Sequence, residues 1–147
     1  SFQNGQYIIV NRMTYRFNPP TRGDVVVFFP PEAPPSNWLE NLIGRPGQTD
    51  LIKRVVAVPG DTVKIEDGQL YVNGEQMVEP YLREPMHPTE TQRWQLLTGQ
   101  FLVFGDNRNF SKDSRAPHIG PVTIEQIIGK VWAIYFPIQD WRIVLKI

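Results

Sequence analysis

The stretch DLIKRVVAVPGD, residues 50–61, places a lysine and an arginine inside an otherwise apolar run. Apolar side chains flank the two basic residues on both sides, and Pro59-Gly60 follows as a turn signal. Such a run predicts a buried β-strand over residues 51–58. Burying an unpaired ammonium group costs free energy. The position of Lys53 therefore has to be explained, and so does its state of charge.

Alternation along this strand divides its side chains between two faces of a sheet. One face carries Lys53 with Leu51, Val55 and Ala57, and the other carries Arg54 with Ile52, Val56 and Val58. A first interpretation makes this an edge strand, on which Lys53 extends its amine into water and discourages aggregation.

A second interpretation makes Lys53 a desolvated lysine. Burial disfavours the charged form and lowers the pKa from its usual value of about 10.4. A neutral lysine amine is a general base that can activate a serine hydroxyl. Arg54 cannot take this role because its guanidinium stays protonated, and we expect it to pair with a carboxylate.

The composition argues against several classes of protein. The chain has 147 residues, the length of one domain, and its 15 basic and 15 acidic residues give a formal net charge of zero. A nucleic-acid-binding domain would carry a basic excess, so no nucleic-acid partner is expected. The absence of cysteine excludes a disulfide scaffold, a thiolate nucleophile and a zinc–thiolate site. No other side chains have metal-site spacing, and we expect neither a metal nor a cofactor.

The sequence shows no targeting or membrane segment. No window approaches the roughly 18 apolar residues of a transmembrane helix, and no signal-peptide pattern opens the chain. The chain begins at Ser1-Phe2 without a methionine. We expect it to be a piece of a longer protein.

The remaining sequence predicts a fold that is all β or nearly so. Strands are expected over residues 7–12, 23–30, 99–107, 130–136 and 142–147. A β-meander is expected over residues 62–77, with turns at Asp67-Gly68 and Asn73-Gly74. Residues 36–44 predict a short helix or else an ordered loop, and a capping pattern at Thr123 and Gln126 predicts one helical turn that ends at Gly129. Residues 79–94 are polar and rich in proline, which predicts a long irregular connection.

The stretch GDNRNFSKDSR, residues 105–115, gathers charged and polar side chains directly after an apolar strand. One interpretation is a surface loop with local turns at its Asn, Asp and Ser residues. The other is a network in which acids and arginines satisfy one another at low exposure. Such a network could hold a small hydroxyl, such as that of Ser111, against a buried amine.

Three stretches resemble the sequence boxes of bacterial type I signal peptidases. They are RGDVVVF (residues 22–28), DLIKRVVAVPGD (50–61) and GDNRNFSKDSR (105–115), the last of which matches the box written GDNR-x-x-S-x-D-SR. Three shorter matches agree with them: NGQYIIVNR (4–12), VNGE (72–75) and EPYL (79–82). The resemblance covers residues 4–136, and three boxes in the same order make it highly specific.

The resemblance implies a serine–lysine endopeptidase that removes signal peptides from exported precursor proteins at Ala-x-Ala sites. It implies an N-terminal membrane anchor and a catalytic domain on the extracytoplasmic side of the cell membrane. The implied partners are the signal peptides of preproteins and the membrane lipid surface. We expect a mainly β, signal-peptidase-like catalytic core formed by residues 1–65 and 98–147, with a smaller β insertion over residues 66–97.

The resemblance also implies roles for individual residues. Lys53 matches the general base, and Ser111 matches the serine that hydrogen-bonds to that lysine and orients it. Arg54 is expected to pair with one of the aspartates of the structural network. The network itself comprises Asp106, Arg108, Asp113 and Arg115.

A strand edge that pairs with the substrate backbone is implied at Asp50, Leu51 and Ile52. An extended peptide that is added to such an edge gains its register from main-chain hydrogen bonds. Leu51, Ile52 and Val27 are candidates for lining shallow apolar pockets, which would exclude large side chains by steric conflict.

This sequence departs from the family at the nucleophile. The family carries it in a Ser-Met-x-Pro box a few residues before the Asn-Gly of residues 4–5, which places the serine four residues before Ser1. The oxyanion hole uses the amide of that serine and a nearby upstream hydroxyl, so it falls outside the 147 residues too. We expect these 147 residues alone to be inactive. Asn109-Phe110 is a smaller departure from the Asp-Asn that is common there.

Other interpretations compete with this one. A LexA-like self-cleaving repressor has similar chemistry, but the sequence holds no DNA-binding segment. A non-catalytic pseudo-peptidase would capture peptides without cutting them. A histidine triad would use His118, Ser114 and Asp113, although triad members usually come from separate segments.

Four large aromatic residues belong either to an apolar surface that faces the membrane or to the core: Trp94, Phe101, Trp132 and Trp141.

Overall fold

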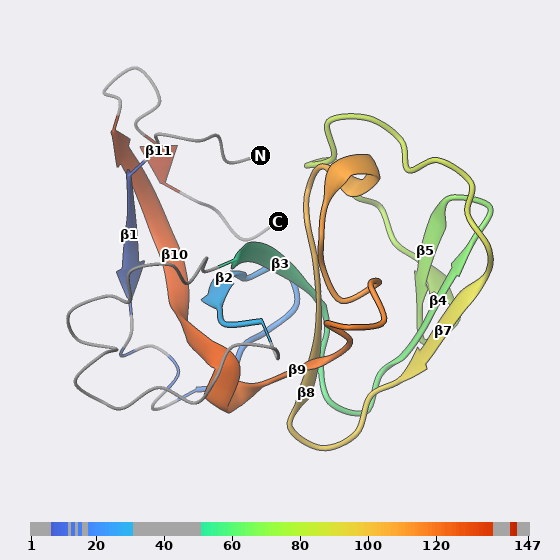
Figure 1. The fold of residues 1–147 in the computed structure, drawn as a ribbon, viewed down its shortest axis with the longest axis horizontal. Helices are drawn as coiled ribbons and strands as arrows, with labels where there is room; N and C mark the ends of the chain where they lie inside the picture. Colours follow the sequence, from blue (N-terminus) through green and yellow to red (C-terminus); the bar gives the residue numbers. More distant parts are fainter. Residues whose placement is uncertain are drawn as a thin grey trace.

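The structure consists of two antiparallel β-sheets (Figure 1). It is a computed structural model, and it describes residues 7–11, 13, 15, 18–30, 51–136 and 142–143. Within these residues the regular elements are strands and short 3-10 turns without an α-helix, so the prediction of a mainly β fold is confirmed. The helix expected over residues 36–44 lies outside the described residues.

The first sheet has seven strands in the order β1-β10-β2-β3-β8-β9, and β11 also pairs with β10. Their bounds are Tyr7–Asn11 (β1), Val25–Phe28 (β2), Leu51–Ala57 (β3), Gln100–Phe104 (β8), Val122–Thr123 (β9), Ile127–Phe136 (β10) and Arg142–Ile143 (β11). Strand β3, which carries Lys53, lies between β2 and β8 in the interior of the sheet. Pairing with β8 begins at Arg54, so within the described part of the chain residues 51–53 are paired on one side only. The edge-strand interpretation therefore holds for the backbone at Lys53, but its side chain is half-buried and does not extend freely into water.

A bulge interrupts the alternation of side chains along β3. The register between β3 and β8 shifts between Val55 and Ala57. Val56 and Ala57 both belong to the apolar cluster between the sheets, whereas Val58 packs in the cluster that holds Val55. The predicted division into two faces is therefore wrong for Ala57 and Val58, because the extra residue of a bulge moves the following side chains to the opposite faces.

The second sheet has four strands in the order β6-β5-β4-β7. Their bounds are Thr62–Glu66 (β4), Gln69–Val72 (β5), Glu75–Gln76 (β6) and Gln92–Gln95 (β7). The predicted meander is confirmed, since both residues of the turns at Asp67-Gly68 and Asn73-Gly74 have the positive φ that two-residue hairpin turns require. Strand β7 corrects the prediction of an irregular connection over residues 79–94, because the last residues of that stretch pair with β4.

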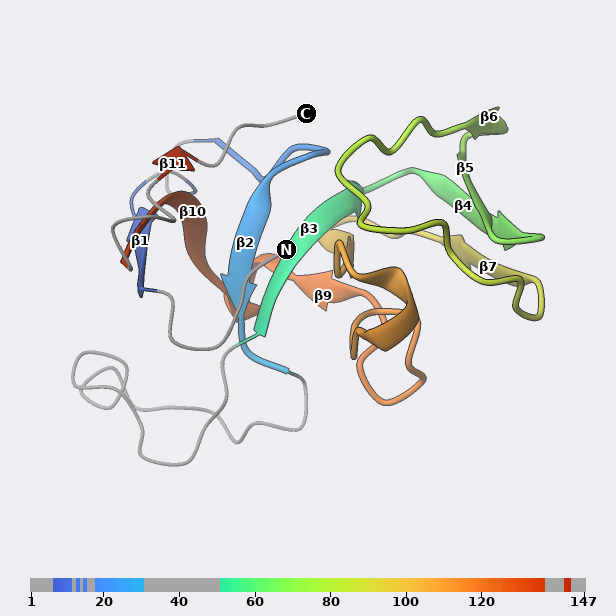
Figure 2. The same cartoon turned by 90° about the horizontal axis from the view of Figure 1, so that it is seen from above.

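A shared apolar cluster joins the two sheets, which Figure 2 shows side by side. The first sheet contributes Leu102 and Phe104 of β8, and the second contributes residues of β4 and β5. Trp94 of β7 packs edge-on against Phe104, with 5.9 Å between the ring centroids. The cluster fixes the end of β8, from which the 105–115 loop starts. The division into a core and an insertion over residues 66–97 stays a prediction.

The 3-10 turn η3 (Ile124–Gln126) lies where one helical turn was predicted. The backbone N–H of Thr123 donates to Gln126 Oε1 at 2.8 Å, so the capping pattern is confirmed. The predicted end of the turn at Gly129 is wrong, because β10 begins at Ile127 and Gly129 lies inside it.

The four large aromatic residues do not share one surface. Phe101 is buried, and Trp94 packs against the cluster between the sheets. Trp132 is 54% exposed, and Trp141 lies outside the described residues. Phe101 and Trp94 therefore belong to the core, and the membrane-facing apolar surface stays a prediction for the other two.

Candidate active site

Lys53 and Ser111 lie beside Gly105, where β8 ends and the chain turns toward the short 3-10 turn η2 (Arg108–Phe110). A methyl group at Gly105 would lie 2.1 Å from Ser111 Oγ and 3.6 Å from Lys53 Cδ. Because Gly105 has no side chain, the Ser111 hydroxyl fills this space next to the stem of the lysine. The site is therefore assembled from β3 and from the loop that follows its neighbour β8.

The hydroxyl of Ser111 is a buried polar group that has no hydrogen-bond partner within the described part of the chain. Leaving such a group unpaired costs about 1–3 kcal/mol. The half-buried Lys53 flanks the same space. The hydrogen bond expected between Ser111 and Lys53 is therefore not formed in this structure, although the two side chains flank the same space.

Burial has the largest effect on the pKa of Lys53 and lowers it below the usual value of 10.5. The negative charges of Asp113 and Asp106 raise this pKa, and the positive charge of Arg115 lowers it further. The net result favours the neutral amine. Lys53 is therefore partly desolvated and differs from a solvated surface lysine.

The beginning of β3 offers an open strand edge. Residues 51–53 pair with β2 on one side, whereas pairing with β8 on the other side starts only at Arg54. Among the described residues, no strand covers the second edge of residues 51–53. An extended peptide can be added to such an edge through main-chain hydrogen bonds. The lysine is the last residue of this open edge.

The residues predicted to contact a substrate lie on two faces of the sheet. Leu51 packs against the apolar cluster on the face of Lys53. Ile52 and Val27 are paired across β3 and β2 and lie together in a cluster on the opposite face. Val27 is only 5% exposed, whereas Ile52 is half-buried. Asp50 lies outside the described residues, and its role stays a prediction.

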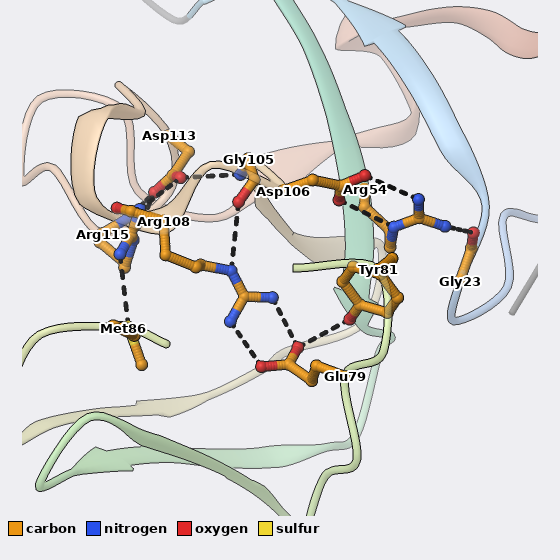
Figure 3. Close-up of polar contacts among 10 residues, drawn as sticks. All are labelled: Gly23, Arg54, Glu79, Tyr81, Met86, Gly105, Asp106, Arg108, Asp113 and Arg115. Atoms are coloured by element: carbon orange, nitrogen blue, oxygen red, sulfur yellow. Dashed lines mark hydrogen bonds and ion pairs between the residues drawn. The ribbon is translucent and has the colours of Figure 1, made fainter. Parts of the chain in front are cut away.

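Arg54, the neighbour of Lys53, is anchored by four contacts that Figure 3 shows. Its guanidinium donates to the two carboxylate oxygens of Asp106 at 2.9 and 2.7 Å, and to the Gly23 carbonyl oxygen at 3.0 Å. Its central carbon lies 4.1 Å from the ring centroid of Tyr81. Because Asp106 belongs to the 105–115 loop, this pair connects the loop directly to the lysine strand.

Asp113 and Arg115 fold the loop back onto Gly105. The buried carboxylate of Asp113 accepts hydrogen bonds from the Gly105 N–H at 2.8 Å and from the Arg115 guanidinium at 2.8 Å. Arg115 also donates to the carbonyl oxygen of Arg108 at 2.7 Å. Three polar residues of this stretch are almost fully buried: Arg108, Asp113 and Ser114. The network interpretation therefore holds for these residues, whereas Phe110, which is 80% exposed, and Lys112 lie at the surface.

Comparison with known proteins decides which family combines these features. The family described as "Signal peptidase, peptidase S26" matches residues 1–136, which is most of the chain. The chain belongs to the signal peptidase I (S26) family. The matched range includes both the lysine strand and the 105–115 loop.

Individual signal peptidases I support the assignment. The chain is 35% identical over 142 residues to a probable signal peptidase I-1 of Synechocystis, covering 96% of this chain and 67% of that protein. It is 35% identical over 144 residues to signal peptidase I V of Bacillus subtilis, covering 89% of this chain and 76% of that protein. The crystal structure of a signal peptidase I from Enterococcus faecalis matches with a TM-score of 0.57 at 26% identity, covering 76% of this chain and 95% of that chain. The chain thus spans about two thirds to three quarters of these two curated relatives.

Sequence reasoning assigns no role to two residues of this signal peptidase site, Glu79 and Tyr81. The Glu79 carboxylate accepts two hydrogen bonds from the Arg108 guanidinium, at 2.7 and 2.5 Å. The Tyr81 hydroxyl donates to Glu79 at 2.7 Å, and its ring stacks on Arg54. Both residues lie in the EPYL stretch, whose resemblance to signal peptidases could have pointed to them. The stretch around it has no periodic pattern, so the sequence gives no indication of their partners.

The histidine triad is not formed in the structure. Ser114 is buried and its Oγ accepts the Val103 N–H at 3.1 Å, whereas His118 is exposed. Over the described ranges, no group of three histidine, cysteine or acidic side chains could hold a metal ion. Within the same ranges, no helix has the length and apolar character needed to cross a membrane.

Proposed function

We propose that this chain is the catalytic domain of a serine–lysine endopeptidase that removes signal peptides from exported precursor proteins. One observation carries the proposal: the half-buried Lys53, whose pKa is lowered, lies beside the buried and unpaired hydroxyl of Ser111. Membership of the signal peptidase I family supports the same reaction.

In the proposed reaction, Lys53 acts as the base in both halves. Its neutral amine takes the proton of the nucleophilic serine, which we place four residues before Ser1, as the serine oxygen attacks the scissile carbonyl carbon. The ammonium then gives this proton to the leaving amine as the peptide C–N bond breaks, which leaves an ester. A water molecule that Lys53 deprotonates hydrolyses the ester, and the proton returns to the serine oxygen. In this proposal the Ser111 hydroxyl, which has no partner among the residues that the structure describes, forms a hydrogen bond with the amine and orients it.

The substrate in this proposal is an extended peptide added to the open edge at residues 51–53. Side chains two residues apart on an added strand face the same way, which suits an Ala-x-Ala pattern. Leu51 and Ile52 form this edge together with Lys53, and Asp50 and Val27 are further candidates for substrate contact. Shallow contacts of this kind admit small side chains and exclude large ones.

The proposed location follows from the substrate. Signal peptides emerge from a membrane, so the domain would work at the lipid surface on the extracytoplasmic side, attached to an anchor N-terminal to Ser1. The lipid surface and the preprotein are the proposed partners, and nucleic acid is not.

A cleavage assay tests this function. The protein to use is the chain lengthened N-terminally through the Ser-Met-x-Pro box, called the extended chain below, with a preprotein that carries an Ala-x-Ala site and lipid vesicles. Lys53→Ala should lower kcat at least about 100-fold, the usual contribution of a general base. Lys112→Ala removes an exposed lysine of the neighbouring loop and should leave kcat unchanged.

Two outcomes would contradict the proposal. Cleavage that survives Lys53→Ala would remove the lysine as the base. A folded extended chain that binds the preprotein without cutting it would instead favour the non-catalytic, peptide-binding pseudo-peptidase.

A further inference from the structure

Residues 79–87, called the strap below, cross the 105–115 loop and bind it along their length. At one end, Glu79 binds Arg108. At the other, the Asn109 side chain donates to Glu84 Oε1 and to the Pro85 carbonyl oxygen at 3.0 and 3.1 Å, and accepts the His87 N–H at 2.9 Å. The strap belongs to the connection between β6 and β7 and lies outside the three long boxes. It is nevertheless in direct contact with the loop that carries Ser111.

The contact between Glu79 and Arg108 is a buried, two-bond ion pair. The Arg108 side chain is fully buried and that of Glu79 is 8% exposed. A guanidinium in this position needs its carboxylate, because removing one partner of a buried pair leaves an uncompensated charge. The same Arg108 donates through Nε to the carbonyl oxygen of Gly105 at 3.2 Å. Glu79 therefore determines where Arg108 lies, and Arg108 holds Gly105.

Gly105 borders both the Ser111 side chain and the stem of Lys53. Its N–H is bound by Asp113 and its carbonyl by Arg108, so both of its polar groups are fixed. The space above its Cα is filled by the Ser111 side chain, next to the stem of Lys53. A rotation of the peptide group at Gly105 would move this wall and displace the serine hydroxyl.

We propose that Glu79 is a positioning residue for the Lys53–Ser111 pair, acting through Arg108 and the carbonyl of Gly105. The inference rests on the proposed serine–lysine function and adds to it a residue of the strap. Tyr81 reinforces the arrangement, since its hydroxyl binds Glu79 while its ring covers Arg54, the neighbour of Lys53 (Figure 3). The strap thus restrains the lysine strand and the serine loop together.

The action of Glu79 is geometric, not a direct effect of its charge on the lysine. The charged groups that act on Lys53 are Asp113, Asp106 and Arg115. Loss of Glu79 should therefore loosen the loop and admit water to the amine, which reduces the desolvation that lowers the pKa of Lys53. The acid limb of the pH profile of kcat, along which Lys53 becomes protonated and kcat falls, should then move to higher pH. KM should change little, because the strap does not form the open edge of residues 51–53.

The test compares variants of the extended chain with a preprotein substrate. Glu79→Gln should lower kcat by about 10-fold to 100-fold, the range expected when a reacting group is displaced by about 1 Å. It should also move the acid limb upward and leave KM within about twofold. Glu79→Asp, which keeps a carboxylate, should recover part of kcat. The control Glu66→Gln removes the ion pair with Lys64 on the second sheet and should leave kcat and the acid limb unchanged.

Each outcome decides the matter. A folded Glu79→Gln variant with the kcat and pH profile of the parent would overturn the positioning role, provided that Lys53→Ala abolishes cleavage. Cleavage that survives Lys53→Ala would overturn the proposed function itself. If Glu79→Gln does not fold, Glu79→Asp and Tyr81→Phe replace it, and a normal kcat and acid limb in both would assign Glu79 to folding alone.

Discussion

Replacing Gly105 by alanine perturbs the site next to both Ser111 and the stem of Lys53. The φ of Gly105 is not positive, so its backbone accommodates alanine without strain. The added methyl group, however, would lie 2.1 Å from Ser111 Oγ and 2.5 Å from Ser111 Cβ. Carbon atoms of this kind essentially never come closer than 3.0 Å to a neighbour, so the serine hydroxyl has to move by about 0.9 Å or more.

A displacement of this size sets the expected magnitude. Misplacing a reacting or orienting group by about 1 Å costs about 100-fold in rate, so kcat of the extended chain should fall by about that factor. Overpacking a buried site costs about 1–3 kcal/mol of stability. For a protein of this size, that corresponds to a decrease in Tm of about 2–12 °C.

The assay measures kcat, KM and Tm for Gly105→Ala, Ser111→Ala and the double variant. Because Ser111→Ala has already lost the hydroxyl, adding Gly105→Ala should lower kcat much less than it does in the parent. Gly74→Ala is the matched control, because its φ of +85° makes alanine strained while no atom lies within 4 Å of the added methyl group. It should lower Tm and leave kcat unchanged. A Gly105→Ala variant with nearly parental kcat, or equal and additive losses in the double variant, would refute the reasoning.

Three further predictions concern stability. Arg54→Met leaves the carboxylate of Asp106, whose side chain is 11% exposed, without its partner. It should lower the free energy of unfolding by up to about 3–5 kcal/mol in urea denaturation, whereas a loss below about 1 kcal/mol would count against the anchoring role. Burial raises the pKa of Asp61, but hydrogen bonds from Arg22 and other donors outweigh this effect, so the net pKa lies below 3.8. Stability should therefore be lost as pH falls below 3.8, and Asp61→Asn should reduce this loss of unfolding free energy in urea titrations at acid pH. Because the pKa of Lys53 is lowered in the folded state, the unfolded chain binds more protons between that lowered pKa and about pH 10.5. Stability should therefore rise with pH between these two values, and Lys53→Met should remove this rise in Tm.

Local patterns were sufficient for the fold class, and they marked Lys53 as unusual without deciding its environment. The apolar run around Lys53 predicted a buried strand. The positive φ at Asp67-Gly68 and Asn73-Gly74 was predicted by the preference of Asp-Gly and Asn-Gly pairs for two-residue hairpin turns. The burial of Lys53 was one of two open interpretations, and the resemblance to signal peptidases favoured it. The proximity of Ser111 also came from the resemblance, since no local pattern relates residues so far apart in the chain.

Long-range contacts account for what the sequence did not predict. Strand β7 is built from polar residues 92–95 and exists because β4 offers a partner for it. The bulge in β3 arises where the register with β8 shifts, which no alternation pattern contains. Arg108 and Glu79 are 29 residues apart in the sequence, and they pair because of how the strap crosses the loop. No local pattern distinguishes Glu79 from the other carboxylates as the partner of Arg108.

The most direct test of the central claim is the pKa of Lys53 itself. An NMR titration of the lysine Cε signals in the extended chain measures it, with the Lys53 signal assigned by its loss in Lys53→Met. The desolvated base that we describe requires a midpoint clearly below the value of about 10.4 for a solvated lysine. A midpoint at or above that value would show that the amine stays charged in this site, and it would contradict the account of Lys53 as a general base.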